Sequence, residues 1–134
     1  MQPDAAWSAI IAGAILRRGA MVHVASSILT FGALLGIALA KIWLGVGVTM
    51  VLLGLVEFWL AARVALDVEL FDAIARSGDL EGFDRTMQAL GLMPADKANR
   101  ALGLRIRGAL RLLWLQALAL VAQIAVLIAG AAWA

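Results

Sequence analysis

Three long stretches of this chain are almost free of charge, and they constrain its fold more than any other feature. Residues 19–40 and 112–134 contain no Asp, Glu, Lys or Arg, and residues 42–62 contain one acid, Glu57. Each stretch has about the 20 residues that an α-helix needs to cross the hydrocarbon core of a bilayer. Because the backbone in lipid must satisfy its own hydrogen bonds, each stretch is predicted to be a transmembrane helix.

The composition excludes a soluble or disordered chain. Hydrophobic residues make up 64% of it and charged residues 15%, whereas a soluble domain has about a quarter charged residues. There is no cysteine, and His23 is the one histidine, so a zinc or haem site would need carboxylates or a second subunit to complete it. No cofactor, metal or catalytic residue is therefore expected. The net charge of +2 is too small to indicate nucleic acid, and the expected partner is the lipid bilayer.

The basic residues predict the orientation. Ten of the eleven fall on one side of the membrane if the N-terminus is cytoplasmic, and Lys41, in the turn between the first two spans, is the exception. The positive-inside rule then places residues 63–111 in the cytoplasm and the C-terminus in the periplasm or outside the cell. The excess of Arg over Lys, with abundant Ala and Leu, is typical of GC-rich bacterial genomes, so the bacterial inner membrane is the expected location.

Residues 1–18 are predicted to form a separate amphipathic segment. Residues 5–16 are apolar but too few to span a bilayer, and they precede the basic pair Arg17–Arg18 rather than following a basic start, as a secretory signal would. An interfacial helix on the membrane surface is the preferred interpretation, and a loosely ordered tail is the alternative. The predicted apolar face consists of Trp7, Ile10, Ile11, Ala14 and Ile15.

Residues 63–111 are predicted to form a cytoplasmic helical hairpin. The helical pattern of the second span continues to Ser77, a short helix covers residues 80–90 before Gly91, and a helix from Pro94 onward leads into the third span. The chain is thus expected to be one all-α domain of three transmembrane helices, of which the second and third extend into an antiparallel hairpin.

Charge complementarity supports this hairpin. The segment 97–111 carries five basic residues and no acid, while residues 63–77 carry three acids and two bases. Antiparallel register predicts that Asp67 lies near Arg105 or Arg107, and that Asp72 lies near Arg100. A solvated charged surface is the alternative, because exposed ion pairs contribute little stability.

A cluster of polar side chains is predicted inside the membrane. Interhelical hydrogen bonds are the preferred interpretation, and a protonatable site centred on His23 and Glu57 is the alternative. The hydroxyls of Ser26, Ser27 and Thr30 are expected to bond to carbonyls of their own helix. The predicted cluster consists of His23, Thr30, Thr49, Glu57, Gln116 and Gln123.

Small residues on the first span predict close helix packing. Gly32 and Gly36 form a small-xxx-small motif, and Ala40 extends it by another four residues. Such a motif lets two backbones approach, either within one chain or between copies. The sequence leaves both uses open, and a homo-oligomer or a membrane complex is the expected assembly.

Three functions remain compatible with these residues. The preferred hypothesis is a non-enzymatic scaffold or accessory subunit that presents its charged cytoplasmic hairpin to a partner. The second is a small oligomeric channel, transporter or holin-like pore that uses Glu57. The third, less favoured, is a quinone- or haem-associated membrane anchor subunit in which His23 is the candidate ligand.

Overall fold

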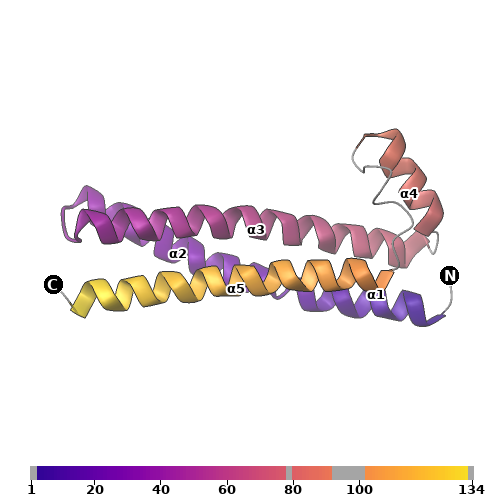
Figure 1. Cartoon of the computed structure of the whole chain (residues 1–134), viewed down its shortest axis with the longest axis horizontal. Coiled ribbons are helices and arrows are strands. Elements are labelled where there is room, and N and C mark those ends of the chain that lie inside the picture. The colour runs from indigo at the N-terminus through magenta and orange to yellow at the C-terminus, as the bar shows by residue number, and fades with distance from the viewer. Residues whose placement is uncertain (1–2, 78–79, 92–101, 133–134) are drawn as a thin grey trace.

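The computed structural model describes residues 3–77, 80–91 and 102–132, and this part of the chain is helical without a strand (Figure 1). Its helices are listed here in chain order: α1 (Pro3–Leu16), α2 (Gly19–Ala38), α3 (Leu44–Ser77), α4 (Leu80–Ala89) and α5 (Leu102–Ala132).

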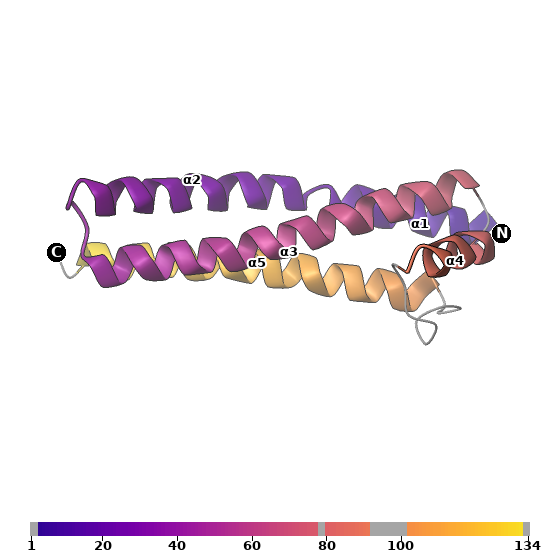
Figure 2. The ribbon, with the colours of Figure 1, turned by 90° about the horizontal axis from the view of Figure 1, so that it is seen from above.

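The long helices lie side by side in an elongated bundle. α3 packs against α1, α2 and α5, and α1 is followed by α2 along almost the same line (Figure 2). The N-terminal end of α1, the C-terminal end of α3 and α4 lie together at one end of the bundle (Figure 1). The turn between α2 and α3 and the C-terminal end of α5 lie at the other end.

Three helices are long and apolar enough to cross a membrane, as the sequence predicts. They are Ala6–Ala38, which joins α1 to α2, Leu44–Arg76 and Leu102–Ala132. At 1.5 Å per residue each is about 45–50 Å long, whereas the hydrocarbon core of a bilayer is about 30 Å thick. The bundle is therefore longer than a bilayer is thick, and the charged residues gather toward the end that holds α1.

α1 is not set apart from the other helices, and its predicted place on a membrane surface stays a prediction. The helix exists, but it runs along the bundle axis and packs against α3 and α5. Ala9, Ala12 and Leu16 are buried. The small side chains of the two alanines let the α1 backbone approach α3 closely. The predicted apolar face is turned outward instead, with Trp7 64% exposed and Ile11 56% exposed.

An apolar core fills the end of the bundle that contains α1. Residues from α1, α3 and α5 meet there, and the C-terminal third of α3 supplies most of the large side chains. The part of α3 beyond residue 63, where the helical pattern was predicted to continue, supplies Val64, Val68, Phe71 and Ile74 to this core. Its buried members are Ala9, Ala12, Leu16, Val64, Val68, Phe71, Ile74 and Ala109.

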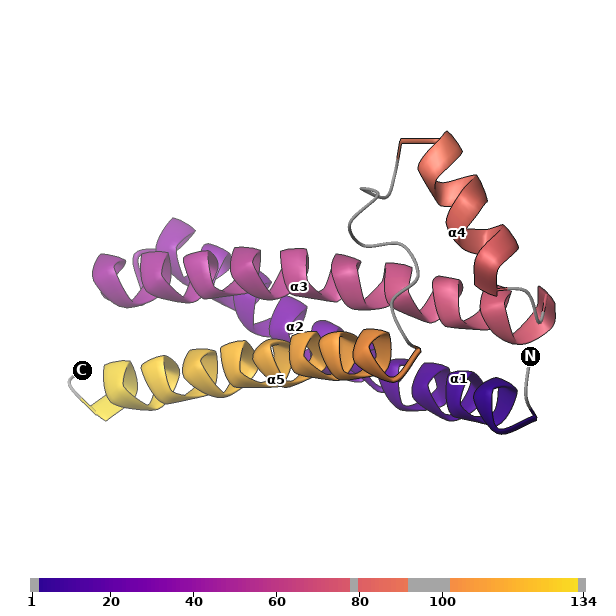
Figure 3. The same ribbon diagram turned by 45° about the vertical axis from the view of Figure 1, so that its right-hand side comes forward.

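The connection between the second and third long helices agrees with the prediction where it is described. α3 continues unbroken to Ser77, α4 covers Leu80–Ala89, and Gly91 follows with a φ of +69°, a conformation that favours glycine. α4 projects away from the axis of the bundle (Figure 3). The predicted helical start at Pro94 and the predicted partner Arg100 lie outside the described residues.

The predicted small-residue motif does not form an internal packing face. Gly32 is exposed, and a Cβ built on it would have no neighbour within 4 Å. Gly36 contacts the side chain of Ile42 in the following turn, and Ala40 has a φ of 51° in that turn, beyond the end of α2. A role for Gly32 between copies of the chain stays a prediction.

Close approach between helices occurs at other glycines. A Cβ on Gly54 of α3 would overlap the Thr30 hydroxyl of α2, and a Cβ on Gly19 would lie 2.9 Å from Gln116 Oε1 of α5. Both glycines lie beside the buried polar side chains, so the missing side chain lets those polar groups meet.

Candidate functional site

One polar cluster joins three helices through Glu57. The Glu57 side chain is 1% exposed, and its Oε1 accepts a hydrogen bond of 2.8 Å from Gln116 Nε2 of α5. Its Oε2 lies 3.0 Å from Nδ1 of His23 on α2. We call His23, Glu57 and Gln116 the first tier. Each of the three long helices supplies one of its side chains.

Gln116 also ties this tier to the start of α2. Its Nε2 donates a second hydrogen bond, of 2.9 Å, to the carbonyl of Gly19. Both contacts use the amide nitrogen, so Oε1 is left buried without a hydrogen-bond partner among the described residues. The Gln116 amide N–H groups therefore tie α5 to both α3 and the start of α2.

A second polar cluster lies further along the bundle, away from α1. Ser26 Oγ donates to Gln123 Oε1 at 2.6 Å, and Gln123 Nε2 donates to Thr30 Oγ1 at 3.0 Å and to the Met50 carbonyl at 3.1 Å. Thr30 Oγ1 in turn donates to the Ser26 carbonyl at 2.8 Å. We call Ser26, Thr30 and Gln123 the second tier, and it too connects α2, α3 and α5.

The predicted cluster is thus divided and partly revised. His23, Glu57 and Gln116 meet in one tier, and Thr30 and Gln123 meet in the other. Thr49 belongs to neither, because it is exposed and donates to the Gly45 carbonyl of its own helix. Ser26 was expected to bond to its own helix but is fully buried against Gln123.

The two tiers are separate along the bundle axis. Gln116 and Gln123 are seven residues apart on α5, which corresponds to about 10 Å. Among the described residues no hydrogen bond connects the two tiers. Gln116 of the first tier donates to the Gly19 carbonyl, and Gln123 of the second tier donates to the Met50 carbonyl. The geometry therefore fits two independent ties between helices better than a continuous polar path.

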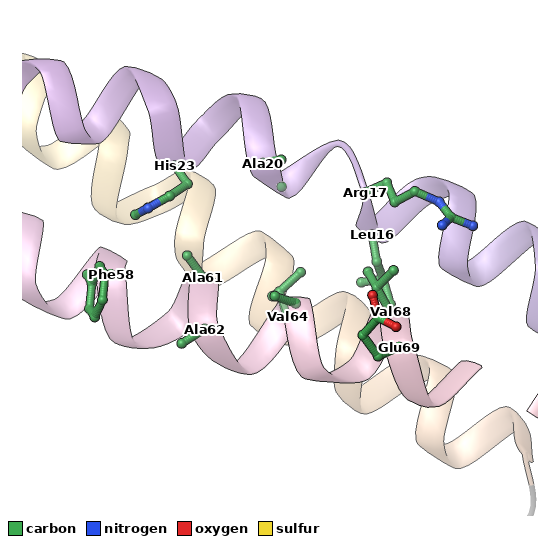
Figure 4. Close-up of a pocket in the computed structure, with 12 residues that line it drawn as sticks. Leu16, Arg17, Ala20, His23, Phe58, Ala61, Ala62, Val64, Val68 and Glu69 are labelled. Carbon is green, nitrogen blue, oxygen red and sulfur yellow. The ribbon is translucent and has the colours of Figure 1, made fainter. Parts of the chain in front are cut away.

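A groove beside the first tier makes part of it accessible. The groove has a volume of about 330 Å³ and lies between α3 and the junction of α1 with α2 (Figure 4). Its walls are mostly small and apolar, with His23 and Phe58 toward one end and Arg17 and Glu69 toward the other.

His23 connects this groove to the buried carboxylate. Its side chain is 35% exposed although its Nδ1 is engaged by Glu57. The Phe58 ring lies beside it, with ring centroids 5.7 Å apart and planes inclined by 53°. His23 is therefore the one member of the first tier whose side chain is partly exposed and lines the groove.

The ion pairs differ from those predicted for the hairpin. Arg105 binds both oxygens of Asp84 in α4, at 2.9 and 2.7 Å, where the sequence predicts Asp67 as its neighbour. Asp72 is paired with Arg17 through two hydrogen bonds of 2.9 and 3.0 Å. The reason is the position of α1, because it occupies the face of α3 that carries Asp72. Arg107 is exposed.

Comparison of the chain with models of protein families, with curated proteins and with solved structures finds no match. The described residues contain no group of three or more His, Cys, Asp or Glu side chains placed to hold a metal ion.

Proposed function

We propose that this chain is a non-enzymatic scaffold or accessory subunit of the bacterial inner membrane that holds one helical end against a partner. The observation that carries this proposal is how the buried polar side chains are used. Glu57, Gln116, Gln123 and Ser26 are each at most 1% exposed, and each is hydrogen-bonded to another helix. Such bonds stabilise a bundle in lipid, where burying apolar surface between helices contributes little.

The proposed membrane position rests on the three apolar stretches and on the arginines that border them. The bilayer covers residues 19–40, 42–62 and 112–134, and the end with α1 and α4 lies in the cytoplasm. Arg17, Arg63 and Arg111 then lie at the cytoplasmic boundary, as the positive-inside rule favours. The Arg63 guanidinium lies 5.3 Å from the centre of the Trp59 ring, and Trp is enriched at this depth. The first tier lies about 6–8 Å inside the boundary.

In this position α1 stands about 20 Å beyond the bilayer and presents an apolar face to water. Trp7, Ile10, Ile11 and Ile15 are exposed along it, and all belong to the side that does not pack on α3 or α5. A contiguous apolar patch outside the membrane is typical of a protein-binding surface. It supports a partner, either a second copy of the chain or another membrane protein, on this face of α1.

The test is the mass of the assembly extracted from native membranes with mild detergent. Native mass spectrometry should give a mass above the 14.1 kDa of one chain. Changing Ile10, Ile11 and Ile15 to Ser should release the single chain, because these changes remove the exposed apolar face. The control is Leu66→Ser with Leu104→Ser, on positions of α3 and α5 that are more exposed than the three isoleucines. A wild-type chain that is monomeric in its own membrane would contradict the proposal.

The channel or transporter hypothesis has less support, because the tiers lie about 10 Å apart along α5. Its test is separate. The purified chain in liposomes should carry no proton or cation flux that depends on Glu57. A flux that Glu57→Gln abolishes in a folded protein would make the transporter the better assignment.

A further inference from the structure

We infer that the groove beside the first tier binds the head ring of a quinone-class lipid, with His23 as its hydrogen-bonding partner. This inference rests on the membrane position proposed above, which places the groove at the boundary between headgroups and hydrocarbon. A volume of about 330 Å³ is at the small end of ligand sites. It suits one ring whose apolar tail continues into the bilayer.

The chemistry of His23 matches both forms of such a head. When Glu57 is ionised it accepts a hydrogen bond from Nδ1, which fixes the tautomer and leaves Nε2 as the second polar atom of the ring. A neutral imidazole accepts at Nε2 from the hydroxyl of a quinol, and an imidazolium donates at Nε2 to the carbonyl of a quinone. With Nδ1 bonded to Glu57, Nε2 of His23 is thus the atom that bonds to either the quinol or the quinone.

The walls of the groove fit a flat and mostly apolar group. Ala20, Ala61 and Ala65 line it. Figure 4 shows Ala20 on the α2 side and Ala61 on the α3 side, so short side chains form this part of the walls. The Phe58 ring beside His23 offers an aromatic edge or face to a second ring.

The charges at the other end of the groove disfavour an anionic lipid headgroup. Arg17 is the cation there, and both of its terminal nitrogens are bound by Asp72. Glu69 adds a negative charge to the same rim. A phosphate would meet a neutralised guanidinium and an unfavourable carboxylate, whereas an uncharged carbonyl head meets neither penalty.

The single histidine makes a direct experiment possible. The chain is labelled with ¹⁵N-histidine and placed in phosphatidylcholine nanodiscs, so that every imidazole signal belongs to His23. Decylubiquinone is then titrated in. The expected result is a saturable shift of the Nε2 signal that is larger than the shift of Nδ1. A shift that never saturates would show only partition into lipid and would overturn the inference.

Two alanine variants test whether the groove itself is the site. Ala65→Leu fills the groove at an exposed position and should weaken binding about tenfold, equivalent to about 1.4 kcal/mol. Ala125→Leu adds the same side chain to an exposed position of α5 away from the groove and should leave binding unchanged. Equal affinity in both variants would contradict the inference, and circular dichroism checks that both are folded.

Two further probes separate this ligand class from others. Phosphatidylglycerol and a cationic alkylamine are titrated in the same nanodiscs, and neither should reproduce the saturable Nε2 shift. If either does so while decylubiquinone does not, the groove is a site for that charged class and the inference is wrong. Because this readout uses the purified chain alone, it does not depend on the partner that the mass measurement tests.

Discussion

The substitution Gly54→Ala tests the contact that most closely links α2 to α3. A Cβ at this position would overlap the Thr30 hydroxyl and lie 2.9 Å from the Thr30 methyl carbon. Thr30 cannot easily turn away, because its side chain is β-branched and its hydroxyl bonds both Gln123 and the Ser26 carbonyl. Either α2 must move away from α3, or the second tier must lose hydrogen bonds.

The magnitude follows from three contributions. Forcing a methyl group into a packed site typically costs about 1–3 kcal/mol. Losing a hydrogen bond between helices in a membrane adds about 0.6–2 kcal/mol. Replacing Gly by Ala inside a helix returns up to about 1 kcal/mol. We therefore expect Gly54→Ala to lower the free energy of unfolding by about 2 kcal/mol.

The assay is reversible unfolding by SDS in mixed micelles, followed by far-ultraviolet circular dichroism. The matched control is Gly32→Ala, where nothing lies within 4 Å of the added carbon, so the protein should be unchanged or slightly more stable. Adding Thr30→Ala to Gly54→Ala removes the overlapping atoms. The double variant should therefore lose about 1 kcal/mol less unfolding free energy than the sum of the two single losses. Equal effects of the two glycine substitutions would refute the reasoning.

Three other outcomes are expected. Glu57→Leu should destabilise the chain by about 1–3 kcal/mol in the same assay, because the first tier loses two contacts, whereas Glu57→Gln should stay within about 1 kcal/mol of wild type; equal loss in both would point to an essential charge. Reporter fusions after residues 77 and 134 should give opposite signals, and matching signals would contradict three spans. Arg105→Ala leaves the buried Asp84 carboxylate without this guanidinium, a loss of about 3 kcal/mol, so hydrogen exchange should rise in α4 and not in α3; unchanged exchange in α4 would show that the pair does not hold it.

Composition and charge placement were sufficient to predict the coarse architecture. Long apolar stretches admit one backbone solution in lipid, so the three long helices follow from the residues themselves. The first tier was also predictable, because His23, Glu57 and Gln116 lie at similar distances from the charged ends of their stretches. Polar side chains at the same level of adjacent apolar helices have few polar partners other than one another.

The packing of α1 was not predictable in the same way. Its large apolar residues gave the clear periodic signal, but its small face, with Ala9 and Ala12, is the one that packs. Periodicity identifies an apolar face, but it does not show whether protein, lipid or water lies against that face. The pairing of Asp72 with Arg17 was missed for this reason, since Arg17 follows α1 in sequence and reaches α3 only because α1 packs there.

Ser26 was missed although a signal was present. His23, Ser26 and Thr30 are spaced three and four residues apart, which places them on one face of α2. A serine on the face that carries two other polar residues is better placed to bond across helices than to its own carbonyls. Thr49, in contrast, is exposed and donates to the Gly45 carbonyl of its own helix.

The two ends of the bundle use different interactions, and the difference agrees with the proposed membrane boundary. The end with α1 holds an apolar core that includes Val64, Val68 and Phe71, and burying such surface is favourable where the surroundings are water. Beyond residue 19 of α2, Glu57 and the buried Gln residues tie the helices, as expected where the surroundings are lipid. The change occurs at the level of Gly19, whose carbonyl accepts from Gln116. In the proposed membrane position the exposed apolar face of α1 lies on the water side, and a partner on that face would account for its exposure.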